Sequence, residues 1–274
     1  MTADKIIDRW SRRRVWRWVA NLLIIGGVLL LAYPAGTWGY TWYEQRHLRA
    51  QLERDNPQLV AAEAALGAQD MVQVMPAVGG TTGSIPAGTG AGQTAAGQGG
   101  AAQVSPGEAA RLAQLAAFKA AADAFDASIG SRSEIGTKSG QPLGRILIPS
   151  IGVNKVIVEG TGDGDLRTGP GHWPETPFPG QGGNFVISGH RTTYGAPFLK
   201  LNKVKVGDEI DVILPYAVAR YVVTRTLIVG PKDVESVAQL GKEQISLAAC
   251  HPIYSASHRI VVQGDLVALK LIVQ

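Results

Sequence analysis

Residues 244–262 read QISLAACHPIYSASHRIVV and contain the one cysteine of the chain, Cys250. A run of apolar and small residues leads into this cysteine, and a second β-branched run opens nine residues later at Arg259. Such runs on either side of a Pro- and Ser-containing stretch predict two neighbouring strands, Gln244–Cys250 and Arg259–Ile272. We therefore expect the thiol and the guanidinium to face each other at one end of a sheet.

The same pattern of short β-branched runs separated by Gly and Pro begins at Gly144. It predicts further strands at Arg145–Ile148, Lys155–Glu159, Asn184–Ser188, Glu209–Leu214 and Ala217–Val229. The strand that opens at Arg259 is interrupted near Gly264. Regular strand spacing with little helix favours a mainly β fold, a closed or nearly closed barrel of about 130 residues.

The segment GTGDGD (160–165) has the composition of a Gly-rich phosphate loop or a calcium loop. The twelfth position counted from Asp163 is Pro174 rather than the Glu of a calcium loop, and no helix is predicted to follow. We interpret the segment as a turn. Five histidines and one cysteine show no metal-ligand spacing, so neither a metal nor a cofactor is predicted.

The basic excess of the chain lies at its beginning. Residues 1–20 carry six basic and two acidic residues, and six minus two equals the formal net charge of +4 of all 274 residues. The remainder is neutral, which argues against a nucleic-acid partner. From Trp18 to Tyr43 no residue is charged, and this segment is long enough to cross a bilayer core of about 30 Å as a helix.

Tryptophans flank this apolar segment, and the basic cluster precedes it. The positive-inside rule then predicts a single-pass protein of the plasma membrane, with residues 1–17 cytoplasmic, a transmembrane helix at 18–43 and the rest extracellular. A cleaved signal peptide is the alternative. It fits less well because the apolar run exceeds a normal h-region and small residues at a cleavage site are hard to find.

Residues 44–104 are predicted to form an extracellular linker. Its part 75–104 is a low-complexity stretch of Gly, Ala, Thr, Gln and Pro, which predicts a flexible spacer with reach from the membrane. An amphipathic helix is predicted at 105–130, with Ser105 as N-cap and Glu108 completing a capping box. Its apolar stripe, which needs a partner surface, is Leu112, Leu115, Phe118, Ala122, Phe125 and Ile129.

A lone cysteine in an exported protein is either buried and inert or present for its chemistry. A thiol nucleophile needs an acid nearby and a donor for the developing oxyanion. His190 follows the strand 184–188 after Gly189, so Cys250, His190 and Arg259 are expected at the ends of three strands on one rim. His251 is a poorer partner, because consecutive strand side chains point to opposite faces.

Two segments resemble the sortase family, and most of all its class E: FVISGHRTTYGAPF (185–198) and, about 60 residues later, SLAACHPIYSASHRIVV (246–262). The stretches RILIPSIGVNKVIVEGT (145–161) and GPGHWPETPFPGQGGN (169–184) are similar to family segments that precede the histidine. The resemblance covers residues 144–274, about half of the chain. It implies a sortase-like closed β-barrel of about seven to eight strands with short helices.

The family carries its nucleophile in a TLxTC strand. Ser246 stands in place of the first Thr, Leu247 and Cys250 agree, and Ala249 replaces the second Thr. The resemblance implies a catalytic domain at 144–274 with Cys250 as nucleophile, His190 as general acid and Arg259 at the transition state. Ala249, Leu247, Tyr194 and Tyr254 lie near these residues and are candidates for substrate binding.

The implied reaction is acyl transfer, which makes the chain a cysteine transpeptidase. Its substrates would be surface proteins with a C-terminal LAxTG- or LPxTG-like sorting signal, cleaved after Thr through a thioester. The acceptor would be an amine of the peptidoglycan precursor or cross-bridge. Pilin-polymerising members carry an N-terminal lid and often a second membrane helix; we find neither after residue 43, which favours surface anchoring over pilus assembly.

Two alternatives stay open. An L,D-transpeptidase, another cysteine-dependent wall enzyme, places Arg two residues after Cys, whereas the gap here is nine. A non-catalytic sortase-like module that binds sorting signals is conceivable because of Ala249. Thiol alkylation separates this module from an enzyme, since a binding module should keep an inert Cys250.

Overall fold

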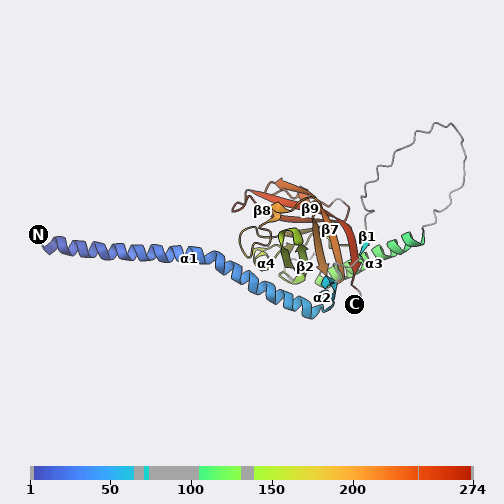
Figure 1. The fold of residues 1–274 in the computed structure, drawn as a ribbon, viewed down its shortest axis with the longest axis horizontal. Helices are drawn as coiled ribbons and strands as arrows, with labels where there is room; N and C mark the ends of the chain where they lie inside the picture. Colours follow the sequence, from blue (N-terminus) through green and yellow to red (C-terminus); the bar gives the residue numbers. More distant parts are fainter. Residues whose placement is uncertain (1–2, 65–70, 74–104, 131–138, 240, 273–274) are drawn as a thin grey trace, which may run out of the picture.

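The computed structural model describes residues 3–64, 71–73, 105–130, 139–239 and 241–272. The low-complexity stretch 75–104 and the segment between 131 and 138 lie outside these residues. The described chain consists of a long N-terminal helix, a β-barrel and a helix packed on that barrel (Figure 1).

The barrel is closed. Its strands follow the order β9-β7-β6-β2-β3-β4-β5-β8, and β8 pairs back with β9. Two pairs, β3 with β4 and β5 with β8, are parallel, and the other neighbours are antiparallel. A further strand of two residues, β1 (Val72–Gln73), pairs with the edge of β9 at Ala268 and Leu269, beyond the part that pairs with β8. The predicted fold class, a closed barrel of seven to eight strands, is thus confirmed.

The strand bounds agree closely with the sequence pattern. The eight barrel strands are β2 (Pro142–Ile148), β3 (Val153–Glu159), β4 (Gly171–His172), β5 (Asn184–Ser188), β6 (Glu209–Leu214), β7 (Ala217–Val229), β8 (Gln244–His251) and β9 (His258–Leu271). Three of them, β5, β6 and β7, have the predicted bounds. The strand β4 was not predicted, because two residues are too short for a periodic signal.

Alternation along β8 separates the barrel interior from its outer face. Ile245, Leu247 and Ala249 belong to the main core cluster inside the barrel. Ala248 belongs instead to a small cluster with Val186, Val237 and Val261. Because side chains alternate along a strand, Cys250 shares the outer face with Ala248.

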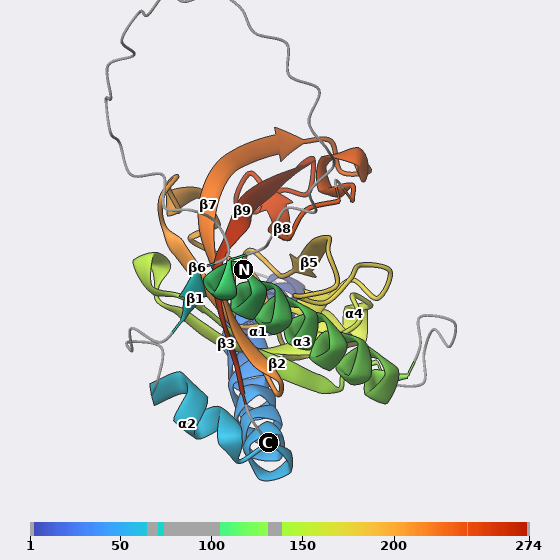
Figure 2. The same cartoon turned by 90° about the vertical axis from the view of Figure 1, so that its right-hand side faces the viewer.

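The predicted amphipathic helix is present as α3 (Pro106–Ile129), with Ser105 as its N-cap; the Ser105 side chain accepts a hydrogen bond from the backbone N–H of Glu108. Its apolar stripe packs on the barrel core from Leu115 onward (Figure 2), whereas Leu112 is 54% exposed. Phe118 and Ala122 are buried there against Gly180, which has a φ of 104°. A side chain at position 180 would put a Cβ 3.0 Å from the Phe118 ring.

The N-terminal helix is longer than the predicted span. One helix, α1, runs from Ala3 to Asp55 with Pro34 inside it, and α2 (Gln58–Ala64) follows. Its apolar part stands clear of the barrel (Figure 1), is 0% buried and has a mean hydropathy of 1.9. Length and composition therefore allow this helix to cross a membrane.

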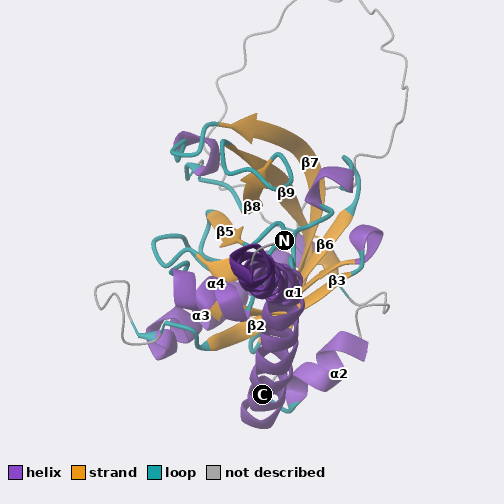
Figure 3. Cartoon of the chain, turned by 90° about the vertical axis from the view of Figure 1, so that its left-hand side faces the viewer, coloured by secondary structure: helices purple, strands orange, loops and turns teal. Residues whose placement is uncertain are grey.

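The last turns of α1 pack on the side of the barrel (Figure 3). Leu48 and Leu52, with Leu59 and Ala62 of α2, form a cluster with the outward-facing valines and isoleucine of the barrel wall: Val156, Val158, Ile213 and Val218. Residues 44–64 of the predicted linker are therefore mostly helical and lie against the barrel wall.

The interpretation of residues 160–165 as a turn is wrong. Residues Asp163–Thr168 form a short helix, α4, after the N-cap Gly162. The carboxylate of Asp165 accepts a hydrogen bond from the Gly162 backbone N–H at 3.0 Å and another from the Ser139 hydroxyl. Capping by a side chain within the first turn compensates for the Gly-rich composition.

Candidate active site

Two parallel strands bring the candidate thiol and imidazole together. Ser188 of β5 pairs with Ala248 of β8, and the Gly189 backbone N–H donates to the Ala248 carbonyl at 3.0 Å. His190 and Cys250 come two residues after this pair, each on its own strand end. Gly189 is required here, because a Cβ would lie 2.7 Å from the ring of Phe198.

Arg259 reaches the same place from the other side of β8. Strands β8 and β9 are antiparallel, and Cys250 lies directly opposite Arg259 in their register. The Arg259 Nη1 group donates to the carbonyl oxygens of Ala256 and His258, both at 3.0 Å. The loop that joins the two strands therefore orients the guanidinium at the strand end.

A groove of about 310 Å³ contains all three side chains. Its floor includes Ala248, Ala249 and Val261, and Trp173 and Leu166 lie along it. One wall is the segment between β7 and β8, which contributes Pro231, Lys232, Asp233, Val234, Ser236 and Val237. The structure thus places Cys250, His190 and Arg259 along one groove, where the sequence predicted one rim.

His190 lies among aromatic and charged groups. Its ring centroid is 5.2 Å from that of Tyr194, and the Arg167 guanidinium lies 5.4 Å from the Tyr194 ring on the other side. Burial lowers the pKa of His190 and the positive charge of Arg167 lowers it further, whereas Asp163 opposes the shift. Both charges come from α4, so this short helix affects the pKa of His190 in both directions.

The wall between β7 and β8 is held by a buried polar network. Asn184 donates from Nδ2 to the Val237 carbonyl at 2.9 Å, and Gln263 donates from Nε2 to the Ser236 carbonyl at 2.8 Å. The hydroxyl of Ser246 joins them: it donates to Asn184 Oδ1 at 2.9 Å and accepts from Gln263 Nε2 at 2.9 Å. Ser246 therefore has a hydroxyl at the position of the first Thr in the TLxTC pattern, and that hydroxyl joins Asn184 to Gln263.

Arg191 is a contributor that sequence reasoning missed. It is 2% exposed, and its Nη1 group donates to the Cys250 carbonyl at 3.1 Å. Its other groups donate to the Leu199 carbonyl and to Asn202 Oδ1. Its place directly after His190 is the only sequence signal, because no periodicity shows that this side chain folds back between two strand ends.

Three of the four residues proposed for substrate binding do not line the groove. The expectation for Leu247 is wrong, because its side chain is 0% exposed and points into the barrel core. Tyr254 is 89% exposed on the loop after β8, and Tyr194 contacts His190 from outside the groove lining. Ala249 does line it, although its methyl group is 3% exposed.

His172, which is not among the residues that line the groove, has structural contacts. His172 is buried, with Nδ1 2.7 Å from a Glu159 carboxylate oxygen and Nε2 3.1 Å from the Thr176 carbonyl. Its ring also packs on Phe178 and Phe185. Within the described part of the chain, no three His, Cys, Asp or Glu side chains gather as a metal site would require.

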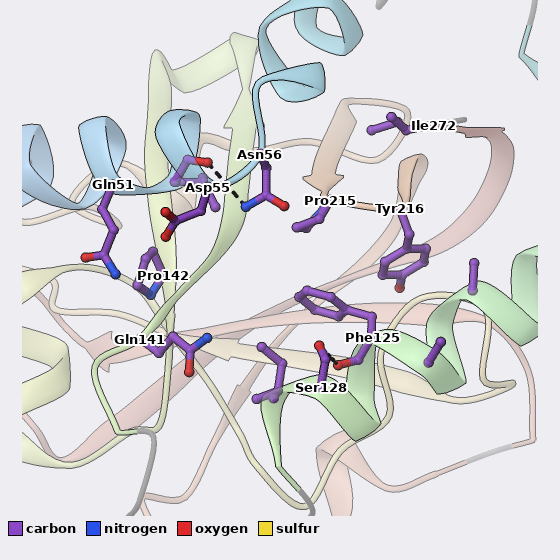
Figure 4. Close-up of a pocket in the computed structure, with 14 residues that line it drawn as sticks. Gln51, Asp55, Asn56, Phe125, Ser128, Gln141, Pro142, Pro215, Tyr216 and Ile272 are labelled. Carbon is purple, nitrogen blue, oxygen red and sulfur yellow. Dashed lines mark hydrogen bonds between the residues drawn. The ribbon is translucent and has the colours of Figure 1, made fainter. Parts of the chain in front are cut away.

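A second and larger groove of about 480 Å³ lies away from these residues. It is formed where the end of α1, the end of α3 and the β6–β7 turn meet (Figure 4). Gln51 and Asp55 of α1 lie across it from Phe125 and Tyr216. None of its lining residues is a cysteine or a histidine, so the groove at Cys250 is the candidate active site.

The barrel is closed, and a thiol, an imidazole and a guanidinium lie along one groove. This arrangement matches the sortase-like barrel that the sequence resemblance implies. The sortase domain family model matches residues 146–267. Among solved structures, sortase E of Streptomyces avermitilis is 33% identical, with 48% of this chain and 92% of that chain covered and a TM-score of 0.45. The chain belongs to the sortase family.

Curated relatives come from more than one branch of the family. Sortase D of Bacillus subtilis is 33% identical over 134 residues, which are 47% of this chain and 66% of that protein. Sortase SrtE1 of Streptomyces coelicolor is 30% identical over 154 residues, or 50% of this chain and 44% of that protein. The chain thus spans 44% to 66% of the length of these relatives.

Proposed function

We propose that the protein is a cysteine transpeptidase that attaches exported proteins to the cell wall. One observation carries the proposal: Cys250, His190 and Arg259, from three neighbouring strand ends, line a single peptide-sized groove. Membership of the sortase family, whose members are cysteine transpeptidases, supports it. The residue roles follow from the chemistry that each side chain can perform at that place.

The proposed reaction has two halves. The Cys250 thiolate attacks the Thr carbonyl of the sorting signal, a C–S bond forms, and the negative charge moves to the carbonyl oxygen beside Arg259. The C–N bond then breaks as His190 donates its proton to the leaving amine, which leaves a thioester on Cys250. The acceptor amine attacks the thioester, gives a proton back to the imidazole and releases the thiolate.

The substrate we propose is a surface protein with a C-terminal LAxTG- or LPxTG-like signal. The LAxTG-like form is preferred because the motifs around Cys250 and His190 are most like class E. The acceptor we propose is an amine of the peptidoglycan precursor or cross-bridge. Neither a metal nor a cofactor takes part in these steps.

We further propose that residues 18–43 anchor the protein in the plasma membrane, with the N-terminus cytoplasmic and the catalytic domain 144–274 outside. The support is the basic cluster and the apolar window of α1 after it, which is 0% buried; the end of the span already contacts the barrel, because Thr41 is 2% exposed and bonds the Arg167 carbonyl. Residues 18–43 are then the central part of a longer helix that continues onto the barrel wall.

The experiment uses the full chain in detergent micelles with quenched peptides bearing LAxTG or LPxTG, with and without an amine acceptor. Intact-mass spectrometry should show an acyl adduct on the wild type that is absent in Cys250→Ala and is released faster by the amine. Absence of an adduct with either peptide, together with a Cys250 that resists alkylation, would instead support the non-catalytic module that the Ala249 substitution made conceivable.

A further inference from the structure

The end of the barrel that carries the groove is also the end that contacts the apolar part of α1. The Thr41 hydroxyl donates to the Arg167 carbonyl at 2.8 Å, and a Cβ on Gly195 would lie 3.0 Å from the Thr41 side chain. Further towards the N-terminus, Tyr33 lies close enough to Tyr194 to interact with it. The loop after β5 and the helix α4 therefore pack on this part of α1.

The C-terminal end of α1 meets the opposite end of the barrel. Asp55 lines the second groove together with Pro142, at the start of β2, and Pro215, in the β6–β7 turn (Figure 4). Figure 1 shows the same polarity: β8 and α4 lie on the side of the apolar part of α1, and α2 lies on the far side. The barrel end with the groove therefore faces the proposed membrane.

The length of α1 places the edge of the bilayer at this contact. Arg17 is the last charged residue before the apolar segment, and a hydrocarbon core of about 30 Å takes about 20 helical residues. The core then ends near Thr37. Trp38 and Trp42 follow with exposed side chains, and tryptophan prefers the headgroup zone. Because the loop after β5 contacts α1 at these same levels, it lies beside the headgroups.

The loop between β8 and β9 carries two exposed apolar side chains at this end of the barrel. The strand β8 runs parallel to β5, and its last pair with β9 is His251 with His258, so residues 252–257 extend beyond the strand ends. Ile253 is 41% exposed and Tyr254 is 89% exposed. Tyr254 also has a φ of 64°, in the left-handed region that bulky residues avoid. No packing inside the barrel compensates for this strain, so the side chain indicates a partner outside it.

We propose that this loop inserts Ile253 and Tyr254 into the headgroup zone of the outer leaflet, so that the groove lies at the membrane surface. The bilayer is the partner because α1 holds this end of the barrel at the level of the headgroups. Tyrosine suits that zone, since its ring is apolar and its hydroxyl stays hydrated. The proposal rests on the proposed function, namely on the anchor at residues 18–43, and it places the groove where a sorting signal close to the membrane can reach it.

The test measures the depth of a fluorescent label at position 254. Cys250→Ser removes the one native cysteine, and Tyr254→Cys then gives a single site for a nitrobenzoxadiazole label in the full chain. The chain is reconstituted into vesicles of phosphatidylcholine and phosphatidylglycerol that contain lipids with a nitroxide on the headgroup or on an upper acyl carbon. We expect these lipids to quench the label at position 254 roughly twofold or more above a label far from the membrane.

Val60→Cys in the same Cys250→Ser chain provides that distant label. Val60 is also an exposed apolar residue, at 57%, but it lies on α2, beyond the end of α1 that is away from the membrane. Both labelled positions are exposed, so neither substitution disturbs the core. Adding Ile253→Asp to the chain labelled at position 254 should reduce the quenching, because a carboxylate is costly to place near acyl chains.

Flotation with the vesicles distinguishes failure of the anchor from failure of the loop contact. A chain that floats but is quenched equally at positions 254 and 60 would overturn the contact and leave the anchor in place. A chain that does not float would overturn both. Quenching that Ile253→Asp leaves unchanged would also overturn the contact. None of these measurements needs a reactive Cys250, so they are independent of whether the peptides form an adduct.

Discussion

At the scale of single residues, burial lowers the pKa of His190, and two charges on one short helix adjust it in opposite directions. Burial and Arg167 lower the pKa of His190, and Asp163 raises it. As the proposed general acid, His190 must be protonated when the amine leaves. A lowered pKa reduces the protonated fraction at neutral pH, so the two charges should set the alkaline limit of the activity.

Opposite shifts are expected from the two charges. Arg167→Gln removes a charge that lowers the pKa of His190, so the alkaline limb of kcat/KM should move to higher pH; Asp163→Asn should move it to lower pH. Both shifts should be a few tenths of a pH unit and should shrink in high salt, because exposed charges are screened. Shifts of the same sign in both variants would show that α4 acts through shape and not through charge.

Ala249 departs from the family pattern, and its surroundings explain how it is accommodated. The residue is 3% exposed, and its methyl group packs among the core residues inside the barrel. Ala249→Thr should therefore overpack the interior and destabilise the protein by about 1–3 kcal/mol, with Ala249→Ser less affected. Denaturant unfolding and kcat/KM measure the two effects; a Thr variant that is as stable as the wild type and faster would contradict this view.

At the scale of elements, the wall between β7 and β8 depends on side chains from the three strands β5, β8 and β9. Asn184, Ser246 and Gln263 hold the carbonyls of Ser236 and Val237 from the outer face of the barrel wall, the face that also carries Val186, Ala248 and Val261. Because these groups are buried, loss of one partner leaves others unsatisfied. The shape of the groove is thus set by polar residues that no substrate touches.

Asn184→Ala should make the segment between β7 and β8 more mobile, because it removes the hydrogen bond to the Val237 carbonyl. We expect a loss of about 1–3 kcal/mol in the free energy of unfolding, from the lost hydrogen bonds to Val237 and Ser246. Deuterium exchange should become faster in residues 234–239, and KM should rise more than kcat falls. Ser255→Ala removes an exposed hydroxyl and is the control; equal exchange in both variants would show that the network does not hold the wall.

The elements also show what the sequence could predict. Short β-branched runs separated by Gly and Pro predicted the bounds of β5, β6 and β7, and the capping signals at Ser105 predicted α3, because each signal is local. The two-residue strand β4 and the helix α4 have no such pattern. Leu247 was named as a substrate-binding candidate from its motif position, although alternation along the strand from Cys250 places it on the opposite, interior face.

At the scale of the whole molecule, the proposed anchor and the barrel form one body. The Thr41 hydroxyl donates to the Arg167 carbonyl at 2.8 Å, which ties α1 directly to α4. Gln45 bonds the Val156 backbone on both sides, donating at 3.1 Å and accepting at 2.8 Å. Side chains that bond a distant backbone leave no trace in hydropathy, so the sequence did not predict that the end of α1 docks on the barrel.

A barrel without its docked helices should therefore be incomplete. A chain that starts at residue 105 exposes the wall cluster of Val156, Val158, Ile213 and Val218, and it loses the burial of Leu48 and Leu52. Burial of a leucine side chain is worth about 1.5–3 kcal/mol, so the melting temperature should fall by roughly 5–15 °C.

Addition of a separate peptide of residues 37–64 should restore much of this loss by binding to the wall cluster, and the same peptide with Leu48→Ser and Leu52→Ser should not. Calorimetry would compare the melting temperatures of the shortened barrel alone, with the wild-type peptide and with the substituted peptide. A shortened barrel as stable as the full chain would mean that the docked helix adds no stability. In that case the polar contacts of α1 and α2 with the barrel, among them those of Thr41, Gln45, Arg49 and Glu63, would hold the barrel to the proposed anchor.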